Sequence, residues 1–307
     1  MHFSVQLPTD RVETPDEFCT ADAIAELAGA IEAAGFDAAY VTEHPFPPDR
    51  WLRSGGHHAF DPFVGLSVAA AATTRIALHT NILVLGYRNP FLLAKAAASL
   101  DVVSGGRVIL GVAAGYLKAE FHALGAEFED RNDRADDALE AMVLAWLGES
   151  VCFEGEGYTA QGNSMLPRPV QRPHPPIWMG GNSARAMRRA VRFADGWSPF
   201  PSPATGAGRT RTAGIEDLDD LAARISQLRT LEREAGRKKP LTICFVPFGL
   251  RMDDRTRIDF AALREQIEAL SRLGVDWVSL GLRGETRSEA LETLAEMAQE
   301  LIAKPAV

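Results

Sequence analysis

The sequence lacks the features that identify several common classes of protein. Its 307 residues contain no apolar run of about 18 residues, the length that a membrane-spanning helix needs. The first residues, MHFSVQLPTD, lack the basic and apolar regions of a secretory signal peptide. Basic residues are in the minority, with 32 Lys and Arg against 41 Asp and Glu, so the formal net charge is -9. We therefore expect neither a membrane nor a nucleic acid as a partner.

Cysteine is also scarce. Cys19, Cys152 and Cys244 are odd in number and far apart, which argues against a disulfide framework and against paired zinc ligands. We expect a cytoplasmic protein without a metal site. The sequence has no HExxH, GxSxG or P-loop motif, and no GxGxxG after its first predicted strand. These absences disfavour metallohydrolases, serine hydrolases and Rossmann-type NAD binding.

What the sequence does have is a regular alternation of short apolar runs and longer amphipathic segments. Eight runs rich in Val, Ile, Leu and Ala are predicted as strands, at 2–8, 37–44, 75–85, 108–115, 176–181, 195–200, 241–248 and 276–282. Amphipathic segments with helical periodicity include 21–35, 138–148, 218–236 and 288–303. Apolar strands that alternate with helices are typical of a parallel sheet covered on its outside. The pattern predicts one domain, residues 1–307, folded as a (β/α)8 TIM barrel.

Two segments interrupt this alternation. Residues 149–175 are rich in Gly and Pro and have no helical period, so we expect an insertion after the fourth strand. Residues 201–214, PSPATGAGRTRTAG, are mostly small and predict a mobile loop.

A candidate proton-transfer pair stands at the end of the second predicted strand. In a TIM barrel the loops after the strands build the active site, and here Glu43 and His44 precede Pro45. A histidine beside a carboxylate can exchange protons near neutral pH. A pair that is merely solvated or bonded to a loop is an equal alternative. His57 and His58, in the following loop, could contact the substrate, although neighbouring histidines on a loop are more often simply exposed.

Polar residues and glycines interrupt the third and fourth strands. The third strand is long and carries His79, Thr80 and Asn81 in its middle, which suggests a bulge toward the cavity. A long strand with satisfied polar side chains is the alternative. Gly111 and Gly115 bracket the end of the fourth strand and would let a ligand approach the backbone. Glycines there are also common for structural reasons.

A candidate phosphate site precedes the helix after the fifth strand. Four residues lead into this helix: Gly180, Gly181, Asn182 and Ser183. Their N–H groups and the positive end of the helix dipole form an anion site, although Asn182 or Ser183 could equally be a plain N-cap. Ser198, at the end of the sixth strand, could extend the site, and Trp197 is predicted to pack.

The same helix carries arginines on one face and apolar residues on the other. The arginines are Arg185, Arg188, Arg189 and Arg192, and the opposite face holds Ala184, Met187, Val191 and Ala194. We predict that the arginines form a solvated stripe, so that the backbone before the helix would hold the phosphate.

Together these motifs resemble the luciferase-like monooxygenase superfamily and, within it, the deazaflavin (coenzyme F420)-dependent oxidoreductases. The resemblance is carried by GFDAAYVTEH, by TTRIALHTNILVLGYRNP with the later LDVVSGGR, and by PRPVQRPHPPIWMGG with the DGW that follows. It covers about two thirds of the chain and ends near Trp197. It implies a (β/α)8 barrel with an insertion after the fourth strand, and a homodimer, since family members are often dimers.

The resemblance also implies roles for particular residues. In family members the third strand ends in a bulge, and a non-proline cis peptide bond there supports the central ring of the cofactor. The matching bond here joins Asn81 to Ile82. His79 departs from the family pattern, which has glycine there. Glu43 and His44 match the residues that face the cofactor ring and the substrate. Gly111, Gly115 and Glu120 lie in the matching fourth-strand segment, and residues 180–183 match the loop around the cofactor phosphate. Asp101 and Arg107 also match, and we expect them to form a structural ion pair.

The function implied is hydride transfer between coenzyme F420 and a small organic substrate. His44 would be the proton donor or acceptor, and Glu43 would bind the cofactor ring or orient His44. The alternative is an FMN-dependent monooxygenase that uses molecular oxygen. Arg209 and Arg211 hint at the acidic tail of the deazaflavin. A flavin-binding barrel without activity, and a phosphate-binding isomerase or aldolase, are further alternatives, although no lysine is convincingly placed at a strand end for Schiff-base chemistry.

Overall fold

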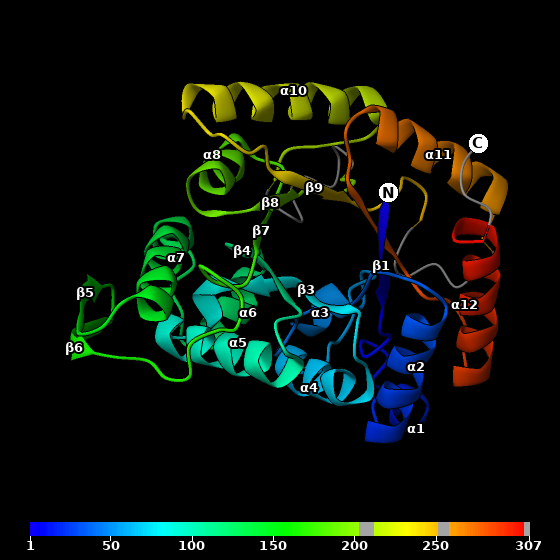
Figure 1. Ribbon diagram of the computed structural model, residues 1–307, viewed down its shortest axis with the longest axis horizontal. Helices are drawn as coiled ribbons and strands as arrows, with labels where there is room; N and C mark the ends of the chain where they lie inside the picture. Colours follow the sequence, from blue (N-terminus) through cyan, green and yellow to red (C-terminus); the bar gives the residue numbers. More distant parts are fainter. Residues whose placement is uncertain (203–211, 251–257, 304–307) are drawn as a thin grey trace.

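The computed structural model describes residues 1–202, 212–250 and 258–303, and within them eight parallel strands close into a barrel (Figure 1). The barrel strands are β1 (His2–Gln6), β2 (Ala38–Val41), β3 (Ala77–Val84), β4 (Val108–Ala113), β7 (Ile177–Gly180), β8 (Gly196–Ser198), β9 (Thr242–Phe245) and β10 (Trp277–Leu280). Around the barrel their order is β1-β10-β9-β8-β7-β4-β3-β2. The predicted TIM barrel is confirmed, and each of the predicted strands contains an observed one.

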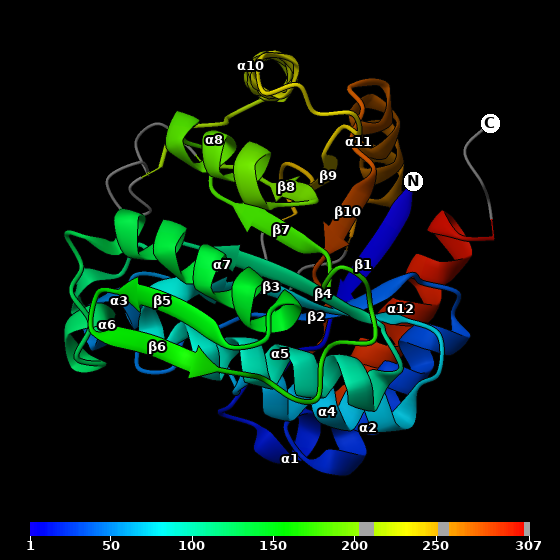
Figure 2. The ribbon, with the colours of Figure 1, turned by 60° about the vertical axis from the view of Figure 1, so that its left-hand side comes forward.

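Helices surround the barrel on its outside (Figures 1 and 2). They are α1 (Pro15–Phe18), α2 (Ala21–Ala33), α3 (Asp49–Leu52), α4 (Pro62–Ala72), α5 (Pro90–Ser104), α6 (Lys118–Ala123), α7 (Arg131–Leu147), α8 (Ala184–Phe193), α10 (Leu218–Glu234), α11 (Phe260–Arg272) and α12 (Arg287–Leu301), with a 3-10 turn, η1 (Leu85–Tyr87), after β3. No helix within the described ranges is both long and apolar enough to cross a bilayer.

Most of the longer helices begin at a short polar residue whose side chain accepts a hydrogen bond from the first turn. These residues are Thr20, Asp61, Asn89, Ser183, Asp217, Asp259 and Thr286. Such a cap stabilises a helix by about 1 kcal/mol relative to alanine. The positions where helices start are therefore encoded locally in the sequence.

The interruption at 149–175 contains a feature that the sequence did not predict. Strands β5 (Val151–Gly155) and β6 (Tyr158–Asn163) form an antiparallel hairpin between α7 and β7. The hairpin lies outside the barrel beside α7 (Figure 2). Of the predicted mobile loop 201–214, residues 203–211 lie outside the described residues, and these include Arg209 and Arg211. Ser202 and Ile215, on either side of that gap, pair as an isolated antiparallel bridge.

Strand β3 is irregular where the polar residues interrupt it. Its register against β4 shifts between Thr80 and Leu83, and the peptide bond from Asn81 to Ile82 is cis. The predicted bulge and the predicted cis bond are therefore both present.

The ion pair expected between Asp101 and Arg107 is wrong. Asp101 is fully buried, and its carboxylate accepts hydrogen bonds from the N–H groups of Val170 and Gln171, at 2.7 and 3.0 Å. Arg107 instead donates to backbone carbonyls on the other side of its turn, including that of Ile76 at 2.9 Å. The two opposite charges are close in the sequence, but each side chain hydrogen-bonds to the backbone of a different loop.

Candidate active site at the carboxyl end of the barrel

A cavity of about 490 Å3 opens at the carboxyl ends of the barrel strands. Most of the predicted site residues line it: Glu43, His44, Asn81, Ile82, Gly115, Gly180, Gly181, Ser183 and Ser198. His57 also lines it, so this histidine is not simply exposed. Four predicted residues do not line the cavity: His79, Thr80, Gly111 and Asn182.

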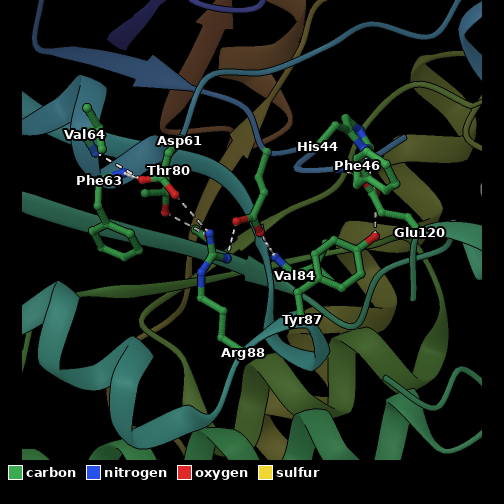
Figure 3. A network of polar contacts seen from close by, with 12 residues as sticks. His44, Phe46, Asp61, Phe63, Val64, Thr80, Val84, Tyr87, Arg88 and Glu120 are labelled. Carbon is green, nitrogen blue, oxygen red and sulfur yellow. Dashed lines mark hydrogen bonds and ion pairs between the residues drawn. The ribbon is translucent and has the colours of Figure 1, made fainter. Parts of the chain in front are cut away.

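Glu43 is tied to the end of β3 rather than to its neighbour His44 (Figure 3). Its side chain is almost fully buried, forms an ion pair with Arg88, and accepts a hydrogen bond from the Val84 N–H at 2.7 Å. Arg88 also contacts Asp61 at 3.4 Å, and Asp61 caps α4. Burial raises the pKa of Glu43, and the Arg88 guanidinium opposes that rise without cancelling it. This network fixes the rim between β2 and β3.

The carboxylate that holds His44 is Glu120, on α6. Nδ1 of His44 lies 3.1 Å from Oε2 of Glu120, and the Tyr87 hydroxyl donates to the same oxygen at 2.7 Å (Figure 3). The other oxygen accepts the Phe46 N–H at 2.9 Å. Burial raises the pKa of Glu120, but these three hydrogen bonds outweigh it and hold the pKa below its usual value. The idea that Glu43 orients His44 is therefore replaced by a His44–Glu120 pair.

This pairing sets what His44 can do chemically. An ionised carboxylate accepts hydrogen bonds only, so Nδ1 of His44 carries hydrogen and Nε2 is the acceptor in the neutral ring. The Tyr116 hydroxyl lies 3.4 Å from Nε2. Burial and the charge of Glu120 raise the pKa of Tyr116, so the phenol stays protonated as a donor. His44 is thus arranged to accept a proton at Nε2 and to be stabilised by Glu120 once it is charged.

Aromatic rings enclose His44. Its ring centroid lies 4.4 Å from that of Trp51, 5.0 Å from that of His57 and 6.0 Å from that of Tyr116. Burial and the neighbouring His44 lower the pKa of His57. This part of the cavity therefore combines flat apolar surfaces with a few polar atoms, as small-molecule sites commonly do.

Three arginines also line the cavity. Arg131, Arg185 and Arg189 line it near the first turns of α7 and α8. Among the described lining residues the only carboxylate is that of Glu43. Helix N-termini and guanidinium groups both favour anions, so this part of the cavity is suited to a phosphate.

The solvated stripe of arginines predicted on α8 is wrong for Arg189. This side chain is only 2% exposed; its Nε lies 2.5 Å from Asp136 and its Nη2 donates to the Asn132 carbonyl at 2.7 Å. Arg185 pairs with Asp133 and Asp136 as well. Of the other two arginines, Arg188 is exposed and Arg192 is an exposed partner of Glu140. The helical periodicity shows which residues share the arginine face of α8, but not that acidic residues of α7 pack against this face.

Ser183 and Asn182, in the loop before α8, have different roles. Ser183 is the N-cap, with its Oγ accepting from the Ala186 N–H at 3.1 Å. Asn182 is fully buried, and its side-chain amide donates to the carbonyls of Phe200 and Ala213, at 2.9 Å each. Its backbone N–H donates to Thr212 Oγ1, also at 2.9 Å. The N–H of Asn182 is therefore engaged by the protein and does not face a ligand.

The remaining predicted site residues lie beneath the cavity and pack the strands. Thr80 donates to the Gly111 carbonyl at 2.9 Å, and a Cβ on Gly111 would stand 2.0 Å from the Thr80 oxygen. His79 is fully buried, contacts Ser4 Oγ at 3.2 Å, and has its pKa lowered to about 3 by burial. Trp197 is buried as predicted, and its indole N–H donates to the Gly181 carbonyl at 2.9 Å.

Sequence reasoning missed several residues around the cavity: Trp51, Tyr87, Arg88, Tyr116 and Arg131. Tyr87 and Arg88 follow the third predicted strand directly and Tyr116 follows the fourth, so the rule that strand ends build the site would have found them. Trp51 and Arg131 carry no comparable signal.

Comparison with known proteins gives a consistent result. Residues 1–248 match the family described as luciferase-like monooxygenase, so the match extends beyond Trp197, where the resemblance was expected to end. An uncharacterized protein of Mycobacterium tuberculosis is 33% identical over 246 residues, which cover 76% of this chain and 80% of that protein. An F420-dependent glucose-6-phosphate dehydrogenase of Nakamurella multipartita is 35% identical over 215 residues, which cover 68% of this chain and 61% of the relative.

A solved structure has the same fold over its whole length. The monooxygenase RslO1 from Streptomyces bottropensis has a TM-score of 0.80, with 100% of both chains covered and 23% sequence identity.

Proposed function

This chain is an enzyme of the luciferase-like monooxygenase family, and on that premise we propose that it transfers a hydride between a deazaflavin, coenzyme F420, and a small organic substrate. The observation that carries the proposal is that one cavity is lined both by His44, which Glu120 holds from behind, and by three arginines. Such a cavity suits a cofactor that is anchored by phosphate and reacts beside a proton-transfer group. The Nakamurella multipartita relative, which is named as F420-dependent, supports the choice of cofactor.

The residues at the cavity fit such a group. Its volume of about 490 Å3 lies in the usual range for cofactor and ligand sites. A Cβ on Gly180 would stand 2.4 Å from Ile82 Cδ1, so the backbone at this position lines the cavity without a side chain. Gly181, Ser183 and the arginines of α7 and α8 would hold the phosphate, and the Asn81–Ile82 segment would support the ring.

When bound, the deazaflavin supplies two-electron hydride chemistry, and the protein supplies placement and electrostatics. His44 holds or accepts the substrate proton at Nε2, and Glu120 stabilises the charged imidazole. Glu43 positions the end of β3 through Val84 and Arg88. The proposal includes a homodimer that is located in the cytoplasm. Sedimentation of the purified protein tests the oligomeric state.

A cofactor titration tests the proposal. Absorbance and fluorescence are followed while the protein is titrated with F420 or with FMN. We expect tight binding of F420 and hydride transfer without oxygen consumption. Binding of FMN alone, with oxygen consumed, would establish the monooxygenase alternative instead, and failure to bind either cofactor would contradict both functions.

A variant pair tests the role of His44. His44→Ala should lose most turnover while the affinity for F420 stays nearly unchanged, because the arginines and the loop before α8, rather than His44, are proposed to hold the phosphate. The control is His122→Ala, which removes an exposed histidine of α6. Equal loss of affinity and turnover in His44→Ala would count against proton transfer by this residue.

A further inference from the structure

A second histidine faces the same part of the cavity as His44. His57 comes from the loop between α3 and α4, and its ring stands nearly perpendicular to that of His44, at 81°, with 5.0 Å between centroids. Trp51 lies beside both rings, 5.7 Å from that of His57. His57 has no role in the proton transfer proposed for His44.

The tautomer of His57 follows from its one hydrogen bond. Nδ1 lies 2.7 Å from the carbonyl oxygen of His58. A carbonyl only accepts, so Nδ1 carries the hydrogen and Nε2 of the neutral ring is an acceptor. Burial and His44 lower the pKa of His57, so the ring stays neutral near pH 7. Within the described chain no protein donor meets Nε2 of His57.

The cavity therefore presents two acceptor nitrogens from adjacent rings. Nε2 of His44 is an acceptor because Glu120 holds Nδ1, and Nε2 of His57 is an acceptor because the His58 carbonyl holds its Nδ1. The Tyr116 hydroxyl lies 3.4 Å from Nε2 of His44, so a substrate with only acceptor groups would leave Nε2 of His57 as the unpaired nitrogen, which costs binding energy. A site built to hydrogen-bond a hydroxyl discriminates strongly against an analogue that lacks it.

We propose that His57 is a specificity-determining residue, which accepts a hydrogen bond from a second hydroxyl beside the reacting one, so that the substrate is a neutral 1,2-diol or polyol. This inference rests on the proposed function. The neighbouring hydroxyls of such a compound are one carbon–carbon bond apart, and hydrogen bonds of about 2.8 Å extend from each. Both rings line the cavity and their centroids are only 5.0 Å apart, so one small molecule can contact both. The adjacent indole of Trp51 suits the C–H face of the same molecule.

In the oxidation of such a substrate the electrons and protons balance. The reacting carbon would give its hydride, with both electrons, to the bound oxidised deazaflavin, and Nε2 of His44 would take the hydroxyl proton. The product is the hydroxy-carbonyl compound. The hydroxyl held by His57 is unchanged, so His57 acts on binding and orientation rather than on the chemical step.

A matched pair of probes tests the role of His57. The protein with oxidised F420 is assayed with 1,2-propanediol and with 2-propanol, which differ by one hydroxyl. We expect kcat/KM to favour the diol by roughly tenfold to a hundredfold, the range for one well-placed hydrogen bond. His57→Phe keeps a ring without the acceptor and should bring the ratio of the two kcat/KM values close to one. His58→Ala is the control, because it keeps the backbone carbonyl that fixes His57.

Two outcomes would overturn the inference. One is a diol preference that survives in His57→Phe, and the other is absence of any preference in the unaltered protein. If F420 does not bind, the proposed function itself has failed. The role of His57 is then decided by 15N NMR of the histidine side chains, in which 1,2-propanediol should shift Nε2 of His57 and 2-propanol should not. The same shift with both alcohols, or with neither, would exclude the site.

Discussion

His44 and Glu120 are separated by 76 positions in the sequence, yet Nδ1 of the first lies 3.1 Å from Oε2 of the second. The pair joins the second and fourth loops of the barrel. It also excludes water from Glu120, whose side chain is fully buried.

Replacing Glu120 by Gln should lower kcat by roughly a hundredfold to ten-thousandfold, the usual contribution of a positioned acid–base system. The amide keeps the shape but loses the charge that stabilises protonated His44. F420 affinity should change little, since Glu120 is not among the residues that line the cavity. The measurements are steady-state kinetics and cofactor titration. Glu127→Gln, an exposed change just past α6, is the control, and an equal effect in both variants would refute the role of Glu120.

Arg88→Met should destabilise the protein by about 3–5 kcal/mol, the usual cost of leaving a buried charge without its partner. Glu43 would then be buried among apolar groups and would take up a proton. The double variant Glu43→Gln, Arg88→Met should recover much of this loss. Free energies of unfolding measured in urea for the single and double variants form a cycle, and simple additivity would show that the two residues are not coupled.

Protonation of His79 should weaken the fold at acid pH. Burial lowers its pKa from 6.5 to about 3, so the unfolded chain binds the proton more readily than the folded one. The stabilising contribution is complete above pH 6.5 and is lost as the pH falls from 6.5 toward about 3. At pH 5 the loss is about 2 kcal/mol, at 1.4 kcal/mol for each pH unit.

The check is the free energy of unfolding at pH 7.5 and pH 5. The unaltered protein should lose about 2 kcal/mol more between these values than His79→Gln does. Exposed His122 serves as the comparison, and its Gln variant should follow the unaltered protein. Parallel curves for all three proteins would contradict the buried neutral state of His79.

Gly111→Ala should disturb the barrel itself rather than a cofactor contact. The new Cβ would stand 2.0 Å from the Thr80 carbonyl oxygen, so β3 and β4 would have to separate. We expect a loss of about 1–3 kcal/mol or more from this overpacking. Gly29→Ala in α2 is the matched control, with its nearest neighbour 4.0 Å from the new Cβ, and it should stabilise by about 0.5–1 kcal/mol. Thermal unfolding without cofactor separates the two, and equal stability would contradict the packing role.

The barrel could be predicted because its information is local. Apolar runs predicted each strand, and the capping residues before the helices are visible in the sequence. Strand ends ran long in the predictions because the chain continues in an extended form into the loops, as at 37–44 against the observed Ala38–Val41. The bulge in β3 was suggested by the polar residues in the middle of that strand, whereas the cis bond from Asn81 to Ile82 was implied only by the family resemblance.

The contacts of the site could not be predicted in the same way. Glu43 is adjacent to His44 in sequence, but successive residues of an extended segment point in opposite directions, so Glu120 became the partner. Asn182 looked like a helix cap or a phosphate ligand, and its true partners lie at residues 200, 212 and 213. Arg189 lies on the arginine face, but α7 packs against that face and buries it. Each error concerns which segment, distant in the sequence, packs against the residue. That is decided by the closure of the barrel rather than by the local sequence.

The Asn182 amide and the Ser202–Ile215 bridge together join both sides of the segment between residues 202 and 212 to the core of the barrel. One buried side chain, that of Asn182, thus reaches Phe200 before that segment and Ala213 after it. Exchange of that stretch for one from a relative would leave the graft points intact. The described contacts therefore mark residues 202 and 212 as points at which a different loop can be joined to the same barrel.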